Sequence, residues 1–212
     1  MALFVDTTAL EDTYEHILPY VQGAPDQTIL YHLRQACIEW CTRTLCWQSD
    51  LDPILTVVDQ DAYDIPLPMD AALVKILGWS VDAGEPLEPT TPAIGRKLQL
   101  NNMGCDALWT ADKISVTVHP MPAVADKEIV LNVALKPTQD ATEIPTAIVE
   151  QYIQHLAAGT IARIAALPKQ PWTDLNLAAM KGAEFENNLT KTASAVSRGN
   201  ARARVRSVAQ FY

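Results

Sequence analysis

The chain has 212 residues, of which 49% are apolar, so its composition is that of a globular protein with a sizeable core. Its formal net charge of −9 disfavours general binding to phosphate backbones, and no apolar run approaches the ~20 residues needed to span a bilayer. The first residues lack the basic and apolar regions of a signal peptide, which favours folding in a cytoplasm.

The N-terminal part of the chain predicts two helices. A short helix is expected around Thr8 to Ile17. A turn containing Pro25 and Asp26 then supplies an N-cap, and the spacing predicts an amphipathic helix from about Asp26 to Gln48. The expected buried face of this helix contains Leu30, Leu33, Cys37, Trp40, Cys41 and Thr44.

Three of the four cysteines lie in this second helix or at its end. Cys37 and Cys41 are about 40° apart on a helical projection, whereas Cys46 is about 180° from Cys37. No pair has the C-x-x-C spacing of a zinc or redox site. The pattern therefore favours reduced core cysteines, with no metal and no disulfide, and we expect neither a chelator nor a reductant to change thermal stability.

From Ser49 onward the hydrophobic period becomes that of β-structure. Short runs rich in β-branched residues are separated by Pro, Gly, Asn and Asp, and the run at 114–119 alternates apolar and polar residues like a half-buried strand. We expect antiparallel strands from about Ile54 to Lys136. The four clearest runs are ILTVV, LVKILGWSV, KISVTVHP and KEIVLNVALKP.

Near Pro145 the helical period returns. One helix is predicted from Pro145, at an N1-like position, to Leu167, and Pro168 closes it. A second helix is predicted from an N-cap at Thr173 to about Ser197, with Gly199 as its stop. Small residues in the first of these two helices, at 157–159, 162, 165 and 166, favour close helix packing.

The order of elements predicts an α+β fold. It consists of a helical bundle built from both chain ends, residues 1–48 and 141–198, with an inserted antiparallel β domain at 49–140 and an extended C-terminal arm at 199–212.

No motif indicates catalysis. The four histidines are scattered, and there is no H-E-x-x-H, G-x-S-x-G or phosphate-binding glycine loop. The acidic strip at 59–70 leaves open either a calcium site or a solvated loop; it lacks the ordered ligand spacing of a calcium loop, which favours the solvated loop. We therefore predict a protein that is not an enzyme and has no cofactor.

Charge is divided unequally along the chain. Residues 1–186 hold all 25 acidic and 11 basic residues, a net −14, while residues 187–212 hold five basic ones, +5. Near the end, Arg202, Arg204 and Arg206 alternate with small apolar residues at the period of a strand. This segment is either a disordered tail or an arm that pairs with a partner's sheet edge while its arginines meet acidic groups. The candidate partner-binding residues are Arg198, Arg202, Arg204, Val205, Arg206, Val208, Phe211 and Tyr212.

Four motifs resemble those of the head-to-tail adaptor (connector) proteins of tailed bacteriophages. They are the LPYV-x-G-x-P turn before the long helix, the A-x-x-E-W-C-x-x-T pattern at 36–44, the Y-DIPLP stretch at 63–68 and the LP-x-x-PW-x-D elbow at 167–174. The resemblance spans nearly the whole chain and is loosest in the β domain. All four are packing and turn signatures.

The resemblance implies a structural role in the virion neck. Such adaptors form a twelvefold ring between the portal and the tail or nozzle protein, clamp the portal through a C-terminal arm, and continue the DNA channel. A negative channel wall would keep DNA from adhering as it passes, without sequence-specific binding, although the negative charge could equally serve solubility. The resemblance implies no membrane partner. Two alternatives stay open: another neck or tail-completion component, and a nucleic-acid-binding regulator that uses its arginine-rich tail.

Overall fold

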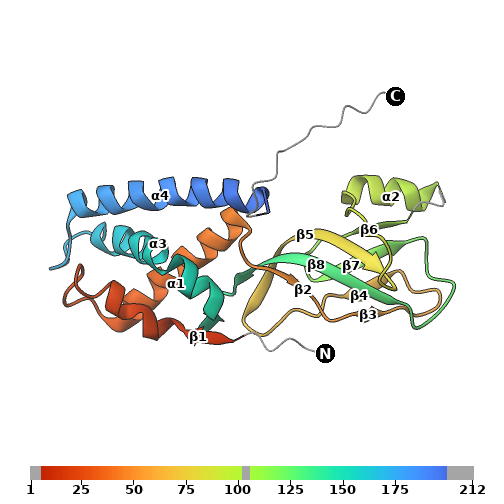
Figure 1. Cartoon of the computed structure of the whole chain (residues 1–212), viewed down its shortest axis with the longest axis horizontal. Coiled ribbons are helices and arrows are strands. Elements are labelled where there is room, and N and C mark those ends of the chain that lie inside the picture. The colour runs from red at the N-terminus through yellow and green to blue at the C-terminus, as the bar shows by residue number, and fades with distance from the viewer. Residues whose placement is uncertain (1–5, 102–105, 200–212) are drawn as a thin grey trace, which may run out of the picture. The chain divides into compact units, whose positions relative to one another are not determined.

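The computed structural model describes residues 6–101 and 106–199, and these form a mixed α+β structure with antiparallel sheets, as the sequence predicts (Figure 1). The chain divides into two compact units. The sheet unit contains residues 47–138, and the helical unit contains residues 6–46 together with 139–199.

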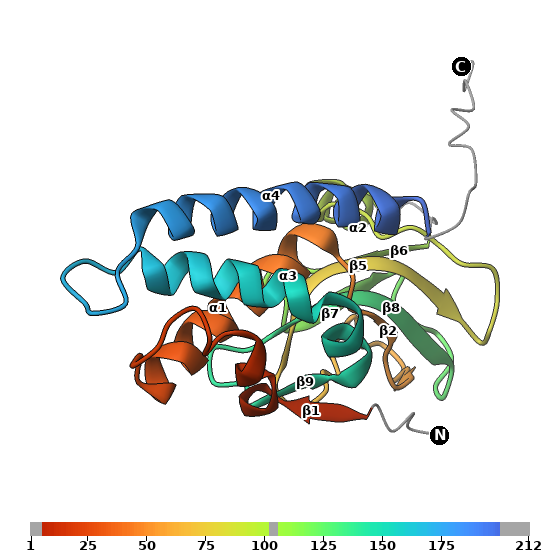
Figure 2. The ribbon, with the colours of Figure 1, turned by 60° about the vertical axis from the view of Figure 1, so that its left-hand side comes forward.

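The helical unit combines two stretches of chain that are far apart in sequence. A two-stranded antiparallel pairing joins them, with Thr8 opposite Ile144. Figure 2 shows α3 running beside α4, and each of the three long helices α1, α3 and α4 contacts the other two. The elements of this unit are β1 (Thr7–Ala9), the 3-10 helix η1 (Leu10–His16), α1 (Asp26–Thr44), β9 (Glu143–Pro145), α3 (Thr146–Ala165) and α4 (Leu175–Ser197).

The first helical stretch differs from the sequence prediction in three details. The expected helix at 8–17 is a short strand followed by a 3-10 helix, because Thr8 pairs with Ile144 in the distant C-terminal segment. The long helix begins at Asp26 but ends at Thr44, where Leu45 takes a left-handed conformation. Gln48, the predicted helix end, lies in a strand. The buried face is as predicted except that Ile29 and Ala36 are fully buried as well and Leu30 is only partly buried.

The two C-terminal helices form where the sequence predicts them, but α3 ends at Ala165 and not at Leu167, and the first residues of both helices differ from the prediction. Pro145 precedes α3 as the last non-helical residue, so it is not at N1. The predicted N-cap Thr173 is wrong: Asp174 caps α4 by accepting hydrogen bonds from the N–H groups of Asn176 and Leu177. Gly199 follows the helix end with φ +66°, consistent with its predicted role as a stop.

The sheet unit contains two antiparallel sheets. In the larger sheet β8 is central: it pairs with β5 along one side and with β2 and β3 along the other. In the smaller sheet β7 lies between β4 and β6. The bounds are β2 (Gln48–Asp50), β3 (Ile54–Leu55), β4 (Ala62–Asp64), β5 (Ala71–Val81), β6 (Ala107–Trp109), β7 (Ser115–His119) and β8 (Glu128–Pro137).

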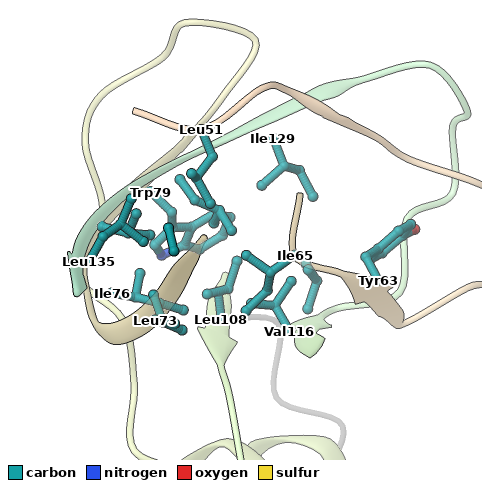
Figure 3. Close-up of a cluster of buried hydrophobic side chains, with 14 residues drawn as sticks. Leu51, Tyr63, Ile65, Leu73, Ile76, Trp79, Leu108, Val116, Ile129 and Leu135 are labelled. Atoms are coloured by element: carbon teal, nitrogen blue, oxygen red, sulfur yellow. The ribbon is translucent and has the colours of Figure 1, made fainter. Parts of the chain in front are cut away.

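Both sheets contribute side chains to one apolar core (Figure 3). Leu131 and Leu135 of β8 are fully buried in it, as are Leu108 of β6 and Val116 of β7. In β7 the residues alternate between buried and partly exposed up to Val118, which confirms the predicted half-buried strand.

One helix inside the sheet unit was not predicted. α2 (Pro92–Leu100) begins with a proline at its first position, a favourable start, but it is only nine residues long and contains Gly95. A methyl group at Gly95 would lie 2.3 Å from the ring of Trp109 in β6. The helix therefore depends on a close tertiary contact with Trp109, which the local sequence does not reveal.

Candidate partner-binding surface

Of the eight predicted partner-binding residues, only Arg198 lies within the described part of the chain. It is the exposed C-terminal cap of α4, and its backbone N–H contacts the carbonyl oxygens of Ala195 and Val196. The other seven, Arg202, Arg204, Val205, Arg206, Val208, Phe211 and Tyr212, lie outside the described residues. The surface that leads to them is the C-terminal half of α4.

α4 is held to the rest of the helical unit along a narrow stripe. Its two buried residues are Phe185 and Leu189, one turn apart, and most of its remaining surface is exposed. A helix with so narrow a buried face leaves much of its circumference available to a partner.

A glycine allows α3 and α4 to approach closely. A methyl group added at Gly159 of α3 would lie 2.6 Å from the Phe185 ring, so no larger residue fits there without movement. One turn away, a methyl group at Gly182 of α4 would meet the Ala162 side chain at 3.8 Å, an ordinary contact. The small residues of α3 thus have the packing role that the sequence predicts.

Trp40 of α1 is the centre of an aromatic cluster that joins the three helices. Its ring centroid is 5.4 Å from that of Tyr152, 5.3 Å from His155 and 5.5 Å from Phe185. Trp40 is fully buried. Burial lowers the pKa of His155 below its ordinary value, so this imidazole is neutral at pH 7 and packs as an aromatic ring.

Four charged residues link the same three helices near their exposed edge. Arg43 of α1 donates two hydrogen bonds to the Glu186 carboxylate of α4, both at 2.8 Å, and one to Glu39 at 2.9 Å. Arg163 of α3 donates to the other oxygen of Glu39. The hydrogen bonds from Arg43 lower the pKa of Glu186.

This ion-pair network affects the charge of the α4 surface. Glu186 is the last carboxylate side chain in the sequence, and Arg43 neutralises it. Along the part of α4 that follows, the charged side chains are Lys191 and the capping Arg198, both exposed and basic. The end of α4 is therefore positive on a chain whose net charge is negative.

The elbow between α3 and α4 is built by the LP-x-x-PW-x-D motif. The Thr173 hydroxyl donates to the carbonyl oxygen of Leu167 and accepts from the N–H of Gln170 at 3.0 Å. The N–H of Asp174 donates to the carbonyl oxygen of Ala165 at 3.0 Å, which ties the start of α4 to the end of α3. Asp174 of the motif and the intervening Thr173 therefore fix the turn between the two helices.

Trp172 is half-buried beside a shallow hollow of about 350 Å³ at this elbow. Tyr20, from the turn before α1, lines the opposite side, and the ammonium of Lys181 lies 5.3 Å from its ring centroid. Trp47 falls within the range predicted for the long helix, but it packs against the core of the sheet unit.

The cysteine geometry differs from the prediction. Because α1 ends at Thr44, the helical projection does not apply to Cys46, and the thiols of Cys46 and Cys41 are hydrogen-bonded to each other. Cys37 and Cys41 are buried core residues, as expected. Cys105 lies outside the described residues.

Within residues 6–101 and 106–199, no three His, Cys, Asp or Glu side chains are grouped so that they could bind a metal ion. In the acidic strip, Asp61 accepts a hydrogen bond from Gln99 at 3.0 Å, while Asp59 and Asp70 occupy left-handed turn positions. None of the described helices is both long and apolar enough to cross a bilayer.

Sequence reasoning missed the residues that join the helices through charge. Glu39 and Arg43 are four residues apart and were recognisable as a helical pair, but their contacts with Arg163 and Glu186 depend on tertiary packing. The predicted N-cap of α4 was Thr173, and the actual cap is the next residue, Asp174. Which of the two residues caps the helix depends on the geometry of the elbow.

Comparisons with known proteins do not identify a family. No protein-family model matches the sequence, and no curated protein matches it significantly.

Proposed function

We propose that this protein is a structural head-to-tail adaptor of a tailed bacteriophage and not an enzyme. In this proposal the helical unit, built from both chain ends, is the bundle of the adaptor, the sheet unit is the inserted domain, and residues 199–212 are the portal-binding arm. Copies form a ring, twelvefold by resemblance, between the portal and the tail or nozzle protein. The protein is made in the host cytoplasm and resides in the virion neck.

The observation that carries the proposal is the elbow between α3 and α4. Two residues of the motif that resembles adaptor proteins have clear structural roles there: Asp174 caps α4, and Trp172 lines the adjacent hollow. The intervening Thr173 makes a further hydrogen bond that defines the turn. A resemblance of packing signatures is supported when those residues pack as a unit.

The charge distribution also supports the proposal. The chain is negative over residues 1–186, which suits a channel wall that must not retain DNA, and positive over its last residues, which suits docking to acidic groups of a portal. The helical unit leaves several large apolar side chains exposed, as expected of a subunit that contacts further copies: Leu18, Tyr20, Tyr31, Leu175 and Met180.

The test uses the portal protein of the phage that the proposal assigns as the source of this chain. The full chain should join portal rings in a stable complex that electron microscopy shows as an added ring. A chain ending at Arg198 should remain folded, because no described contact of either unit requires residues beyond it, yet it should lose stable attachment. A triple variant R202A/R204A/R206A should retain weaker attachment, because backbone pairing and the terminal Phe211 and Tyr212 are still present.

Two results would contradict the adaptor proposal. One is a truncated chain that joins portal rings with unchanged affinity. The other is a full chain that ignores the portal but binds duplex DNA with steep salt dependence, which would favour the regulator.

A further inference from the structure

The backbone turns back on itself at the C-terminal end of α1. Leu45 has φ 55° and ψ 32°, and its N–H donates to the carbonyl oxygen of Cys41 at 3.0 Å. A left-handed residue after a helix returns the chain toward the last turn and brings the next residue close to it. Consistent with this, the N–H of Cys46 donates to the Thr44 hydroxyl at 3.3 Å, and the Cys46 and Cys41 thiols are hydrogen-bonded.

This geometry selects one pair among the three cysteines. Cys37 and Cys41 are one helical turn apart, where Cβ atoms are about 5–6 Å apart. A disulfide requires Cβ atoms about 3.5–4.5 Å apart, so those two cannot bridge within the helix. Cys46 lies on the returning chain, free of the helical spacing, directly after the left-handed Leu45 whose N–H is bonded to Cys41, a position whose side chain commonly packs against that of Cys41.

The members of the pair differ in their access to dissolved reagents. Cys41 and Cys37 are each 1% exposed, whereas Cys46 is partly exposed. Burial raises the pKa of the Cys37 thiol to about 12, and the hydrogen bond of the Cys41 thiol with Cys46, together with burial, raises the pKa of Cys41. Since the thiolate is the reactive form, both buried cysteines are protected from direct attack by an oxidant.

We propose that Cys46 and Cys41 are an oxidation site that hydrogen peroxide converts to an intramolecular disulfide. The sulfur of Cys46 attacks one peroxide oxygen, the O–O bond breaks, and a sulfenic acid and one water form. The sulfur of Cys41 then attacks the sulfur of Cys46, and the S–OH oxygen leaves as a second water with the thiol proton. Two thiols are oxidised by two electrons and the peroxide is reduced to two waters.

The disulfide would fix the point at which the chain leaves the helical unit. Cys46 is the last residue of that unit in this part of the sequence, and Trp47 is the first of the sheet unit. The bond would close a loop from Cys41 to Cys46 and hold the junction residue against α1. This inference is independent of the proposed adaptor function.

Peptide mapping tests the proposal on the full chain. The protein is treated with hydrogen peroxide under native conditions, alkylated with N-ethylmaleimide in denaturant and digested with trypsin. Trypsin cuts after Arg34, Arg43 and Lys75, so Cys37 and Cys41 lie in peptide 35–43 and Cys46 in peptide 44–75. We expect these two peptides to be joined by a reducible bond, with loss of two hydrogen atoms and with most chains converted.

Matched alanine variants identify the partner of Cys46. C37A should retain the link and C41A and C46A should lose it, since Cys37 and Cys41 share a helix face and a degree of burial. If C41A does not fold, fragmentation of the wild-type linked peptide still assigns the bridged sulfur. A bridge to Cys37, a bridge only between two chains, or oxidation of Cys46 without any bridge would each overturn the proposal.

Discussion

The two units of this protein are built in different ways. The sheet unit is one continuous stretch of chain. Its core is spread over both sheets, and residues of β5, β7 and β8 pack into the same apolar cluster. The helical unit joins two distant stretches, and α4 is attached through the buried side chains of Phe185 and Leu189. The core of the sheet unit is therefore spread over many strands, whereas the attachment of α4 within the helical unit is concentrated at two buried positions.

The largest expected effect comes from removing one buried side chain from each unit. Phe185→Ala should lower the free energy of unfolding by about 3–5 kcal/mol and Leu131→Ala by about 2–5 kcal/mol, because each leaves a cavity. Hydrogen exchange should then rise in α1, α3 and α4 for the first variant and in β5 and β8 for the second. If both variants loosened both units equally, the units would fold as one and the comparison would fail.

A smaller effect should separate two glycines of the α3–α4 contact. Gly159→Ala forces a methyl group into the Phe185 ring and should destabilise the protein by about 1–3 kcal/mol in urea unfolding. Gly182→Ala is the matched control: its methyl group meets Ala162 at an ordinary distance, so better helix propensity should stabilise by up to about 1 kcal/mol. Equal responses of the two variants would show that the close approach at Gly159 is not needed.

The smallest effect concerns the ion pairs at the edge of the helical unit. Arg43 lowers the pKa of Glu186 in the folded protein, so this pair stabilises above the ordinary glutamate pKa, and the stabilisation is lost as pH falls through the lowered value. Because Glu186 is exposed, Glu186→Gln should cost under about 1 kcal/mol at neutral pH. The difference from wild type should vanish in acid.

Glu150→Gln is the control for that comparison. Glu150 is an exposed carboxylate of α3, and no ion pair to it is found among the described residues. Thermal melts of both variants across the acid range would decide the matter: a Glu150 variant with the same pH profile would mean that the change reflects overall charge and not the contact with Arg43.

Much of the fold followed from local signals. The switch of hydrophobic period near Ser49 and near Pro145 predicted the order of helices and strands, and the alternation in β7 predicted its buried residues. The candidate arm, from Arg198 to Tyr212, is likewise a conclusion from sequence pattern. Only its first two residues, the exposed cap Arg198 and Gly199, lie within the described chain.

What the sequence by itself determined is therefore the type and order of the long elements, because their hydrophobic period is a local property. Tertiary structure decided the rest. Thr8 lies in a strand because Ile144 supplies its pairing partner. α2 packs closely on β6 because Gly95, which has no side chain, leaves room for the Trp109 ring. The left-handed turn at Leu45 brought Cys46 to Cys41, against the helical projection. These outcomes depend on residues distant in sequence or on one backbone conformation at a helix end, and neither is encoded in a periodic pattern.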